Sequence, residues 1–349
     1  MREILETAFR HESVHFFSDR SSGLKSIIAI HNTRLGPAIG GCRIRPYGST
    51  SAALTDVLRL SQAMTYKCAI AGIPFGGGKA IVVAEPKEHK TVELLHAFGK
   101  AVDSLGGRYI TSFDMGTTMD DIRTIGEVTP HVAGIDAECG NASASTAQGV
   151  LACIETSIRY LLGADRSLDG IRVAIQGVGN VGGRLARLLS AQGARLVLAD
   201  IDQQRVGLMA EELDASILGI DEIISADVDV FSPCALGGIL SQASIGRIRA
   251  PIIAGGANNQ LTCPRVGTEL REQGILYAPD YLTNAGGIID LHYQLNKERR
   301  ENLKMHLRRL GKILRRVYER SAETGLATNE IADQLAEEVV RSGKIHAAS

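Results

Sequence analysis

Two hydrophobic patterns alternate along the chain and predict its secondary structure. Runs of consecutive apolar residues, rich in Ile and Val, predict buried strands, whereas apolar residues three or four positions apart predict one face of a helix. In the first part we expect strands over 25–31, in 79–86 after a glycine loop, and at the start of 108–125. We expect helices over 51–72 and 91–107, and a glycine-rich turn over 35–49. Ser51 is the expected N-cap of the first helix.

The second part of the chain repeats this alternation. We expect a strand over 171–176, a glycine turn, a helix, and a second strand over 195–199. Further strands that end in loops are expected in 226–235, 250–259 and 274–287, and helices over 146–163 and 297–320. Strands and helices in alternation are typical of α/β folds.

A small, polar, aperiodic segment over 140–149 separates the two parts and is the best candidate for an interdomain hinge. A length of 349 residues also suits two domains, at roughly 150 residues each. We therefore expect two α/β domains with a cleft between them. The first is an open α/β domain over 1–138, and the second is a Rossmann-type domain over 139–325. Residues 326–349 are expected to pack back on the first domain as a helix.

Composition narrows the class of function. Apolar residues make up 44%, charged residues 22%, and the net charge is -1, so neither a disordered chain nor a nucleic-acid or membrane partner is indicated. No run approaches the ~18 apolar residues that span a bilayer, and the N-terminus lacks a signal-peptide pattern, so we expect a cytoplasmic protein. The six cysteines have no metal-binding spacing, so we expect buried thiols and no metal. The basic helix over 297–320 lacks interleaved aromatic residues, and we interpret its charge as a solvated face.

A G-x-G-x-x-G run follows one predicted strand and opens a predicted helix: Gly177, Val178, Gly179, Asn180, Val181 and Gly182. Its glycines permit a tight turn, approach of a pyrophosphate and close packing of the helix, whose N-terminus offers N–H donors. Asp200, at the end of the next strand, can accept hydrogen bonds from the ribose hydroxyls of NAD and would repel a 2′-phosphate. Since no arginine follows until Arg205, NAD is favoured over NADP.

Two lysines of the first part stand in unusual settings. Lys67 lies near the end of a predicted helix, and Lys79 ends a glycine run before an apolar strand. A phosphate loop is excluded, because Ile73 and Ala80 occupy the positions that need Gly and Ser or Thr. A desolvated lysine beside another cation has a lowered pKa and can act as a base, with Lys67 as the neighbour of Lys79 and Asp114 as a proton relay. Spacing alone leaves two solvated surface lysines as the alternative.

These features stand among ordered motifs that resemble the glutamate/leucine/phenylalanine/valine dehydrogenase family. The motifs run through most of the chain: LGPAIGG, MTYKCAIAGIPFGGGK, FDMGTT, GVGNVG, PCALGG, AGGANNQL and YAPDYLTNAGG. Within the family, the chain looks most similar to the leucine branch and to the tryptophan and phenylalanine branches.

The resemblance implies NAD-dependent, reversible oxidative deamination of an L-amino acid to a 2-oxo acid and ammonia, by a homo-oligomer that assembles through the first domain. It implies that Lys67 binds the substrate carboxylate, that Lys79 is the general base and that Asp114 assists proton transfer. The further substrate-binding residues that it implies are Ile39, Gly40, Gly41, Asn258, Asn259 and Leu291. The residues that it places near the nicotinamide are Thr146, Cys234, Ala235 and Asn284.

The substrate side chain is expected to be hydrophobic. In the glutamate branch a lysine precedes the Gly-Gly pair and binds a second carboxylate, but here Ile39 occupies that position and offers no counter-charge. Leu291 is a candidate for a second apolar wall. Leucine, valine, phenylalanine and tryptophan all stay open, because one or two methylenes change discrimination by only about 1–3 kcal/mol.

Two other functions compete with this interpretation. One is an NAD-binding relative that has lost turnover, against which the presence of Lys67, Lys79 and Asp114 argues. The other is oxidation of a 2-hydroxy acid, which usually needs a His base. His292 comes nearest to such a motif, but a place at the start of a helix explains it as well.

Overall fold

The computed structural model of the chain describes residues 2–135 and 142–345. The chain forms two compact α/β units, each with its own hydrophobic core. The residues before 136, with those from Ala336 onward, make the first unit, and the second unit ends at Leu335. The C-terminal division thus falls after the expected position, so that 326–335 group with the second unit.

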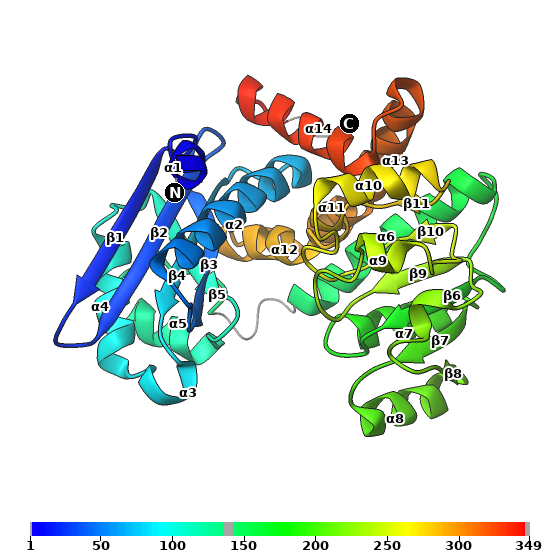
Figure 1. The fold of residues 1–349 in the computed structure, drawn as a ribbon, viewed down its shortest axis with the longest axis horizontal. Helices are drawn as coiled ribbons and strands as arrows, with labels where there is room; N and C mark the ends of the chain where they lie inside the picture. The colour runs from blue at the N-terminus through cyan, green and yellow to red at the C-terminus, as the bar shows by residue number, and fades with distance from the viewer. Residues whose placement is uncertain (1, 136–141, 346–349) are drawn as a thin grey trace. The chain divides into compact units, whose positions relative to one another are not determined.

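The first unit is built on a five-stranded mixed sheet with the strand order β1-β2-β4-β3-β5 (Figure 1). β2 is antiparallel to both β1 and β4, whereas β3 is parallel to both β4 and β5. The strands are β1 (Ser13–Asp19), β2 (Leu24–Asn32), β3 (Ala38–Arg45), β4 (Gly76–Val83) and β5 (Tyr109–Phe113).

Helices cover both faces of this sheet. Val57 and Leu58 of α2 pack against alternate residues of β2 and β4, such as Ile81. The residues between them, such as Val82, face a larger core that α4 and α5 close. The helices of this unit are α1 (Arg2–Ala8), α2 (Thr50–Ala71), α3 (Pro86–His89), α4 (Val92–Asp103) and α5 (Met119–Gly126).

The second unit holds a six-stranded parallel sheet with the order β11-β10-β9-β6-β7-β8 (Figure 1). Its central strands are buried and apolar, as is typical of parallel sheets. The strands are β6 (Arg172–Gln176), β7 (Arg195–Ala199), β8 (Ser216–Ile217), β9 (Val230–Pro233), β10 (Ile252–Ile253) and β11 (Leu276–Tyr277).

The helices of the second unit include α6, on which α7, α12 and α13 all pack. The helix expected over 297–320 has the apolar face that its spacing predicts. The residues of that face are all buried: Leu303, Leu307, Leu310, Leu314 and Val317. The helices are α6 (Ala142–Leu162), α7 (Gly182–Ser190), α8 (Gln203–Leu213), η1 (Ile223–Ser225), α9 (Gln242–Ile245), α10 (Pro264–Glu272), α11 (Asp280–Thr283), α12 (Gly286–Leu295) and α13 (Arg300–Thr324).

The last helix, α14 (Thr328–Ser342), takes part in both units. At its start, Thr328 Oγ1 donates a hydrogen bond of 2.7 Å to the carbonyl of Tyr277 in the second unit. Beyond Leu335 the same helix completes a small apolar cluster of the first unit, where Ala336 packs with Leu35.

Glycine content misled the sequence analysis at two places in the first sheet. The expected turn over 35–49 contains β3, which lies between β4 and β5. The expected glycine loop before Lys79 is the first half of β4. These glycines serve packing: a Cβ on Gly77 would lie 2.0 Å from the backbone N of Thr65, and one on Gly78 would lie 2.7 Å from the Tyr109 ring. The sheet therefore contacts its neighbours more closely than any side chain allows.

Two helix starts also differ from expectation. Ser49, and not Ser51, caps α2, with its side chain accepting from the backbone N–H of Ala52. The expected hinge over 140–149 is helical from Ala142 onward, and residues 140–141 lie outside the described residues. Small residues in this stretch permit close packing, since a Cβ on Gly149 would lie 3.0 Å from Leu310.

No helix in the described ranges 2–135 and 142–345 has both the length and the hydropathy that a bilayer-spanning segment needs.

Replacing Gly77 with Ala tests the close contact between β4 and α2. The new Cβ would overlap the backbone of Thr65, so the free energy of unfolding should fall by about 1–3 kcal/mol. Gly48→Ala is the matched control, because nothing lies within 4 Å of its added Cβ, and it should stay within about 0.5 kcal/mol of wild type. Denaturant unfolding followed by circular dichroism measures both, and equal stability of the two variants would contradict the packing argument.

Candidate active site

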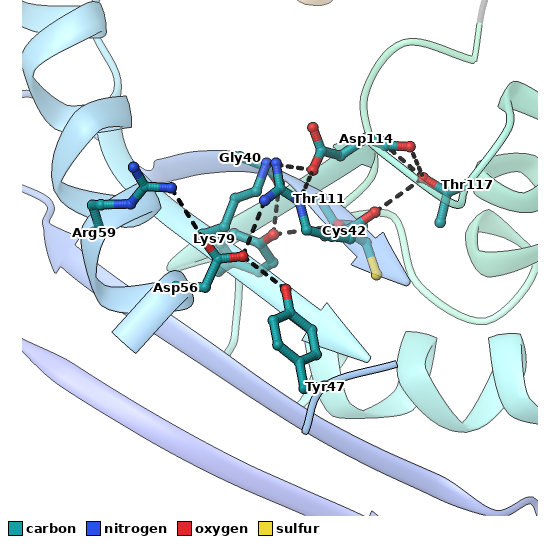
Figure 2. A network of polar contacts seen from close by, with 11 residues as sticks. Gly40, Cys42, Tyr47, Asp56, Arg59, Lys79, Thr111, Asp114 and Thr117 are labelled. Carbon is teal, nitrogen blue, oxygen red and sulfur yellow. Dashed lines mark hydrogen bonds and ion pairs between the residues drawn. The ribbon is translucent and has the colours of Figure 1, made fainter. Parts of the chain in front are cut away.

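The first unit places a buried lysine beside a carboxylate. Lys79 lies in the middle of β4 and, two residues before Ile81, projects toward the face that α2 covers. Its side chain is only 7% exposed, and its Nζ lies 3.1 Å from Oδ2 of Asp114, which directly follows β5 (Figure 2). Thr117 fixes the backbone there, because its Oγ1 accepts from the N–H of Asp114 at 2.8 Å.

A second cation binds the same carboxylate oxygen. Arg43, near the end of β3, donates from Nε to Asp114 Oδ2 at 2.8 Å and from a terminal nitrogen to Oδ2 of Asp56 at 3.0 Å. Asp56 lies on α2 and also accepts from the Tyr47 hydroxyl at 2.7 Å. Arg43, Tyr47 and Asp56 were not among the residues expected at this site. With β3 taken for a turn, no signal placed Arg43 between the two carboxylates.

These neighbours shift the ionisation of the pair. Burial lowers the pKa of Lys79, Asp114 raises it and Arg43 lowers it, and the net direction is downward. Burial raises the pKa of Asp114, but Lys79 and Arg43 outweigh it and the net shift is downward. Asp114 is therefore an ionised carboxylate, and Lys79 loses its proton more readily than an ordinary lysine. The expected direction for Lys79 is confirmed, and Arg43 supplies a neighbouring cation that the sequence did not indicate.

The predicted substrate residues of the first unit fall into two groups. Lys67 is half-buried on α2, the helix that covers the face toward which Lys79 projects. Ile39, Gly40 and Gly41 are buried in β3, and Ile39 is 0% exposed. Packing explains both glycines, because a Cβ on Gly40 would lie 1.8 Å from the carbonyl oxygen of Gly78, and one on Gly41 would lie 2.5 Å from that of Phe113.

The glycine turn of the second unit has the geometry of a dinucleotide loop. Gly177 has a φ of 94°, which favours glycine. A Cβ on Gly182 would lie 1.9 Å from the carbonyl oxygen of Gly177, whereas Gly179 is exposed, with nothing near its added Cβ. Asn180 is exposed as well, and no side chain caps the N-terminus of α7 at Val181. The backbone donors at this helix start are suited to an anion.

Asp200 lies beside this turn at the end of β7 and is 7% exposed. Its Oδ2 accepts from the N–H of Val178 at 2.7 Å, and its Oδ1 accepts from the N–H of Asp202 at 3.0 Å. Arg205, the first arginine after the strand, reaches within 3.8 Å of Oδ2. Backbone donors therefore hold the Asp200 carboxylate at the turn, and the positive charge of Arg205 on α8 partly offsets its negative charge.

The residues predicted near the nicotinamide lie in the same unit. Ala235 packs on the turn, since its Cα is 2.9 Å from a Cβ built on Gly177. Asn284 donates to Oδ1 of Asn258 at 2.8 Å, while its own buried Oδ1 has no hydrogen-bond partner among the described residues. An unpaired buried amide oxygen is costly unless a ligand pairs with it. Together with the open Gly179 and the uncapped α7, this oxygen makes the second unit suited to a dinucleotide.

Four further predicted residues show no unusual polar geometry. Thr146 lies on α6 and donates to the carbonyl of Ala142 at 2.7 Å. Cys234 accepts from the N–H of Gly256 at 3.4 Å, and burial raises the pKa of its thiol. Asn259 has a left-handed backbone with a φ of 52°. Leu291 is half-buried on α12.

Within the described ranges 2–135 and 142–345, no three His, Cys, Asp or Glu side chains gather into a group that could hold a metal ion.

Comparison with protein families covers both units. The model of the Glu/Leu/Phe/Val dehydrogenase dimerisation domain matches residues 10–131, and that of glutamate/leucine/phenylalanine/valine dehydrogenase matches residues 140–204 and 198–335.

Individual proteins match along nearly the whole chain. The chain is 41% identical to leucine dehydrogenase from Geobacillus stearothermophilus over 96% of its own length and 92% of the relative's. It is 43% identical to L-tryptophan dehydrogenase from Nostoc punctiforme (96% and 94%) and 40% identical to phenylalanine dehydrogenase from Bacillus thermotolerans (97% and 91%).

Solved structures show the same relationship. The crystal structure of L-tryptophan dehydrogenase from Nostoc punctiforme superposes with a TM-score of 0.87, at 41% identity and 98% coverage of both chains. A glutamate dehydrogenase from Thermus thermophilus, at 23% identity and with a TM-score of 0.78, shares the fold (99% and 92% coverage). The chain therefore belongs to the glutamate/leucine/phenylalanine/valine dehydrogenase family of oxidoreductases.

Proposed function

We propose that the protein catalyses NAD-dependent, reversible oxidative deamination of a hydrophobic L-amino acid to the 2-oxo acid and ammonia. The observation that carries this proposal is the buried Lys79, 3.1 Å from an ionised Asp114, in a chain about 40% identical to three amino-acid dehydrogenases. A lysine with a lowered pKa supplies the base that deamination needs near neutral and alkaline pH.

The proposed roles follow the chemistry of each group. Lys67 pairs with the substrate carboxylate, helped by Asn258 and Asn259. Lys79 takes a proton from the substrate amine while the Cα hydride leaves, and the resulting imine is then attacked by water that Lys79 deprotonates. Asp114 receives or returns these protons through its contact with Lys79, and ammonia departs as the 2-oxo acid forms. A bound nicotinamide supplies the hydride acceptor.

The cofactor belongs to the NAD(P) class that this family uses, and we propose NAD. The support is Asp200, whose carboxylate lies at the glycine turn and would repel a 2′-phosphate. Arg205 lies 3.8 Å from this carboxylate and reduces the repulsion, so we expect a partial preference for NAD over NADP.

The substrate side chain is proposed to be branched-chain or aromatic. The position that would supply a counter-charge for a second carboxylate is Ile39, inside the first unit's core. Similarity to leucine, tryptophan and phenylalanine dehydrogenases is nearly equal, so a tryptophan- or phenylalanine-specific enzyme stands beside a leucine or valine enzyme. We also propose a homo-oligomer assembled through the first unit, which the family model describes as a dimerisation domain.

The direct test is a screen of the twenty L-amino acids for formation of reduced cofactor, run with NAD and NADP in parallel. Activity with leucine, valine, phenylalanine or tryptophan and none with glutamate is expected. Turnover of glutamate alone, or of no amino acid, would refute the proposal.

Lys79→Ala should lower kcat by about 10²- to 10⁴-fold, the usual contribution of a general base, while NAD binding measured by calorimetry persists. Lys100→Ala, on an exposed turn of α4, is the matched control and should retain wild-type turnover. Equal turnover by the two variants would remove Lys79 from the mechanism.

Asp114→Asn should move the pH–rate profile of deamination toward lower pH. Wild-type rate should rise with pH and reach half its maximum below 10.5, the ordinary pKa of a lysine, because burial lowers the pKa of Lys79. Asp114 raises that pKa, so its removal lowers the pKa further and shifts the rising limb down, with a loss in kcat. A rate that is flat from about pH 7 to 10.5 in the wild type would argue against a lysine base.

Asp200→Asn should narrow the preference for NAD over NADP. Like-charge repulsion costs several kcal/mol, so its loss should reduce the ratio of kcat/KM values for the two cofactors by at least about tenfold. Steady-state kinetics with saturating amino acid measures this ratio, and an unchanged ratio would show that Asp200 does not face the ribose.

A further inference from the structure

Behind the lysine–carboxylate pair lies a second layer of charge. Asp56 on α2 accepts from the Tyr47 hydroxyl at 2.7 Å and from Arg59 at 3.3 Å (Figure 2). Arg43 connects Asp56 with Asp114. The Arg43 side chain is 14% exposed and that of Asp56 is 16% exposed. Two carboxylates hold the Arg43 guanidinium in a place with little solvent, so its side chain is more constrained than that of most surface ion pairs.

Arg43 and Lys79 share one oxygen, Oδ2 of Asp114. When Lys79 loses its proton, that carboxylate still has a cation at 2.8 Å and does not become a buried, unpaired anion. The Arg43 charge at this oxygen opposes a second positive charge on Lys79. Arg59 is 59% exposed, so water screens its charge and it contributes little to this effect.

We propose that Arg43, anchored by Asp56, is a positioning residue that holds Asp114 against Lys79 and supplies the permanent positive charge that lets Lys79 exist as a neutral amine. This inference rests on the proposed function, because a neutral Lys79 matters only if it acts as a base. Arg43 acts through Asp114 and Lys79 and does not itself transfer protons, since guanidinium stays protonated in proteins.

The elements around Lys79 carry several groups that respond to charge, with Cys42 and Tyr109 on the opposite face of the sheet. The titratable and charged residues of the strands, loops and helix packed around Lys79 are Cys42, Arg43, Tyr47, Asp56, Arg59, Tyr109 and Asp114, with Lys67 further along α2. Burial raises the pKa of Cys42, Tyr47 and Tyr109, so these three remain neutral below the titration of Lys79. Arg43 and Asp114 are the charged neighbours that act directly on Lys79.

The experiment compares Arg43→Gln, Arg43→Lys and Asp56→Asn by two readouts. The first is the pH dependence with which acetic anhydride acetylates Lys79, followed by mass spectrometry, which reports its titration without any turnover. The second is the pH–rate profile of deamination. Thermal unfolding checks that each variant folds.

Arg43→Gln should raise the apparent pKa of Lys79 by about one unit, shift the rising limb of the profile to higher pH by the same amount, and lower kcat at least about tenfold through misplacement of Asp114. Arg43→Lys keeps the charge but loses the two-ended contact, so its titration should stay near wild type while kcat falls. Asp56→Asn removes an anion beside Arg43 and should move the titration of Lys79 downward. Opposite shifts in two variants of one ion pair are not produced by loss of structure alone.

Arg59→Gln is the matched control, since Arg59 contacts the same Asp56 at 3.3 Å and, within the described residues, forms no ion pair with Asp114. Its Lys79 titration should match the wild type. An unchanged titration in Arg43→Gln, or an equal shift in Arg59→Gln, would overturn the inference. If Arg43→Gln does not fold, Asp56→Asn decides: a downward shift supports the inference and no shift overturns it.

The two readouts separate this inference from the proposed function. Absence of turnover with every amino acid, combined with the expected titration shifts, would refute the proposed function while leaving the electrostatic role of Arg43 in place. Turnover that Lys79→Ala abolishes, combined with an unmoved Lys79 titration in Arg43→Gln, would refute the inference alone.

Discussion

The first unit depends on the burial of one ammonium group in the middle of a sheet. Transfer of the Lys79 side chain out of water is costly unless a partner offsets it, and the partner here is a carboxylate at the end of a neighbouring strand. Parallel pairing of β3 with both β4 and β5 makes the arrangement possible, because it brings Arg43, Lys79 and Asp114 to one side of the sheet. The glycines of β3 and β4 allow the backbones of this sheet and its neighbours to approach closely.

The sequence predicted the second unit more fully than the first. Its strands β6 and β7, the glycine turn and Asp200 are local features, each read from a few consecutive residues, and they stand where they were expected to within one residue. The first unit depends on contacts between distant segments. β3 could not be recognised because Gly40 and Gly41 lower its strand propensity, and their reason lies across the sheet in Gly78 and Phe113.

The candidate site divides in the same way. Lys79 and Asp114 were found because a lysine after three glycines and an aspartate after a strand are unusual locally. Arg43 was missed because its importance comes from Asp56 and Asp114, which lie 13 and 71 positions away along the chain. The pKa of Lys79 has the expected direction and burial, as expected, is its largest cause, whereas the contribution of Arg43 was not foreseen.

The last helix carries a consequence for how the molecule is made. A ribosome delivers the strands of the first unit early, yet part of that unit's apolar packing, around Leu35 and Ala69, uses Ala336 and the residues after it. The Tyr66 hydroxyl likewise donates a hydrogen bond of 2.6 Å to the carboxylate of Glu337, which is synthesised much later. Domains usually fold in the order of their synthesis, but here residues around Leu35 and Tyr66 reach their final packing only after Ala336 and Glu337 have emerged.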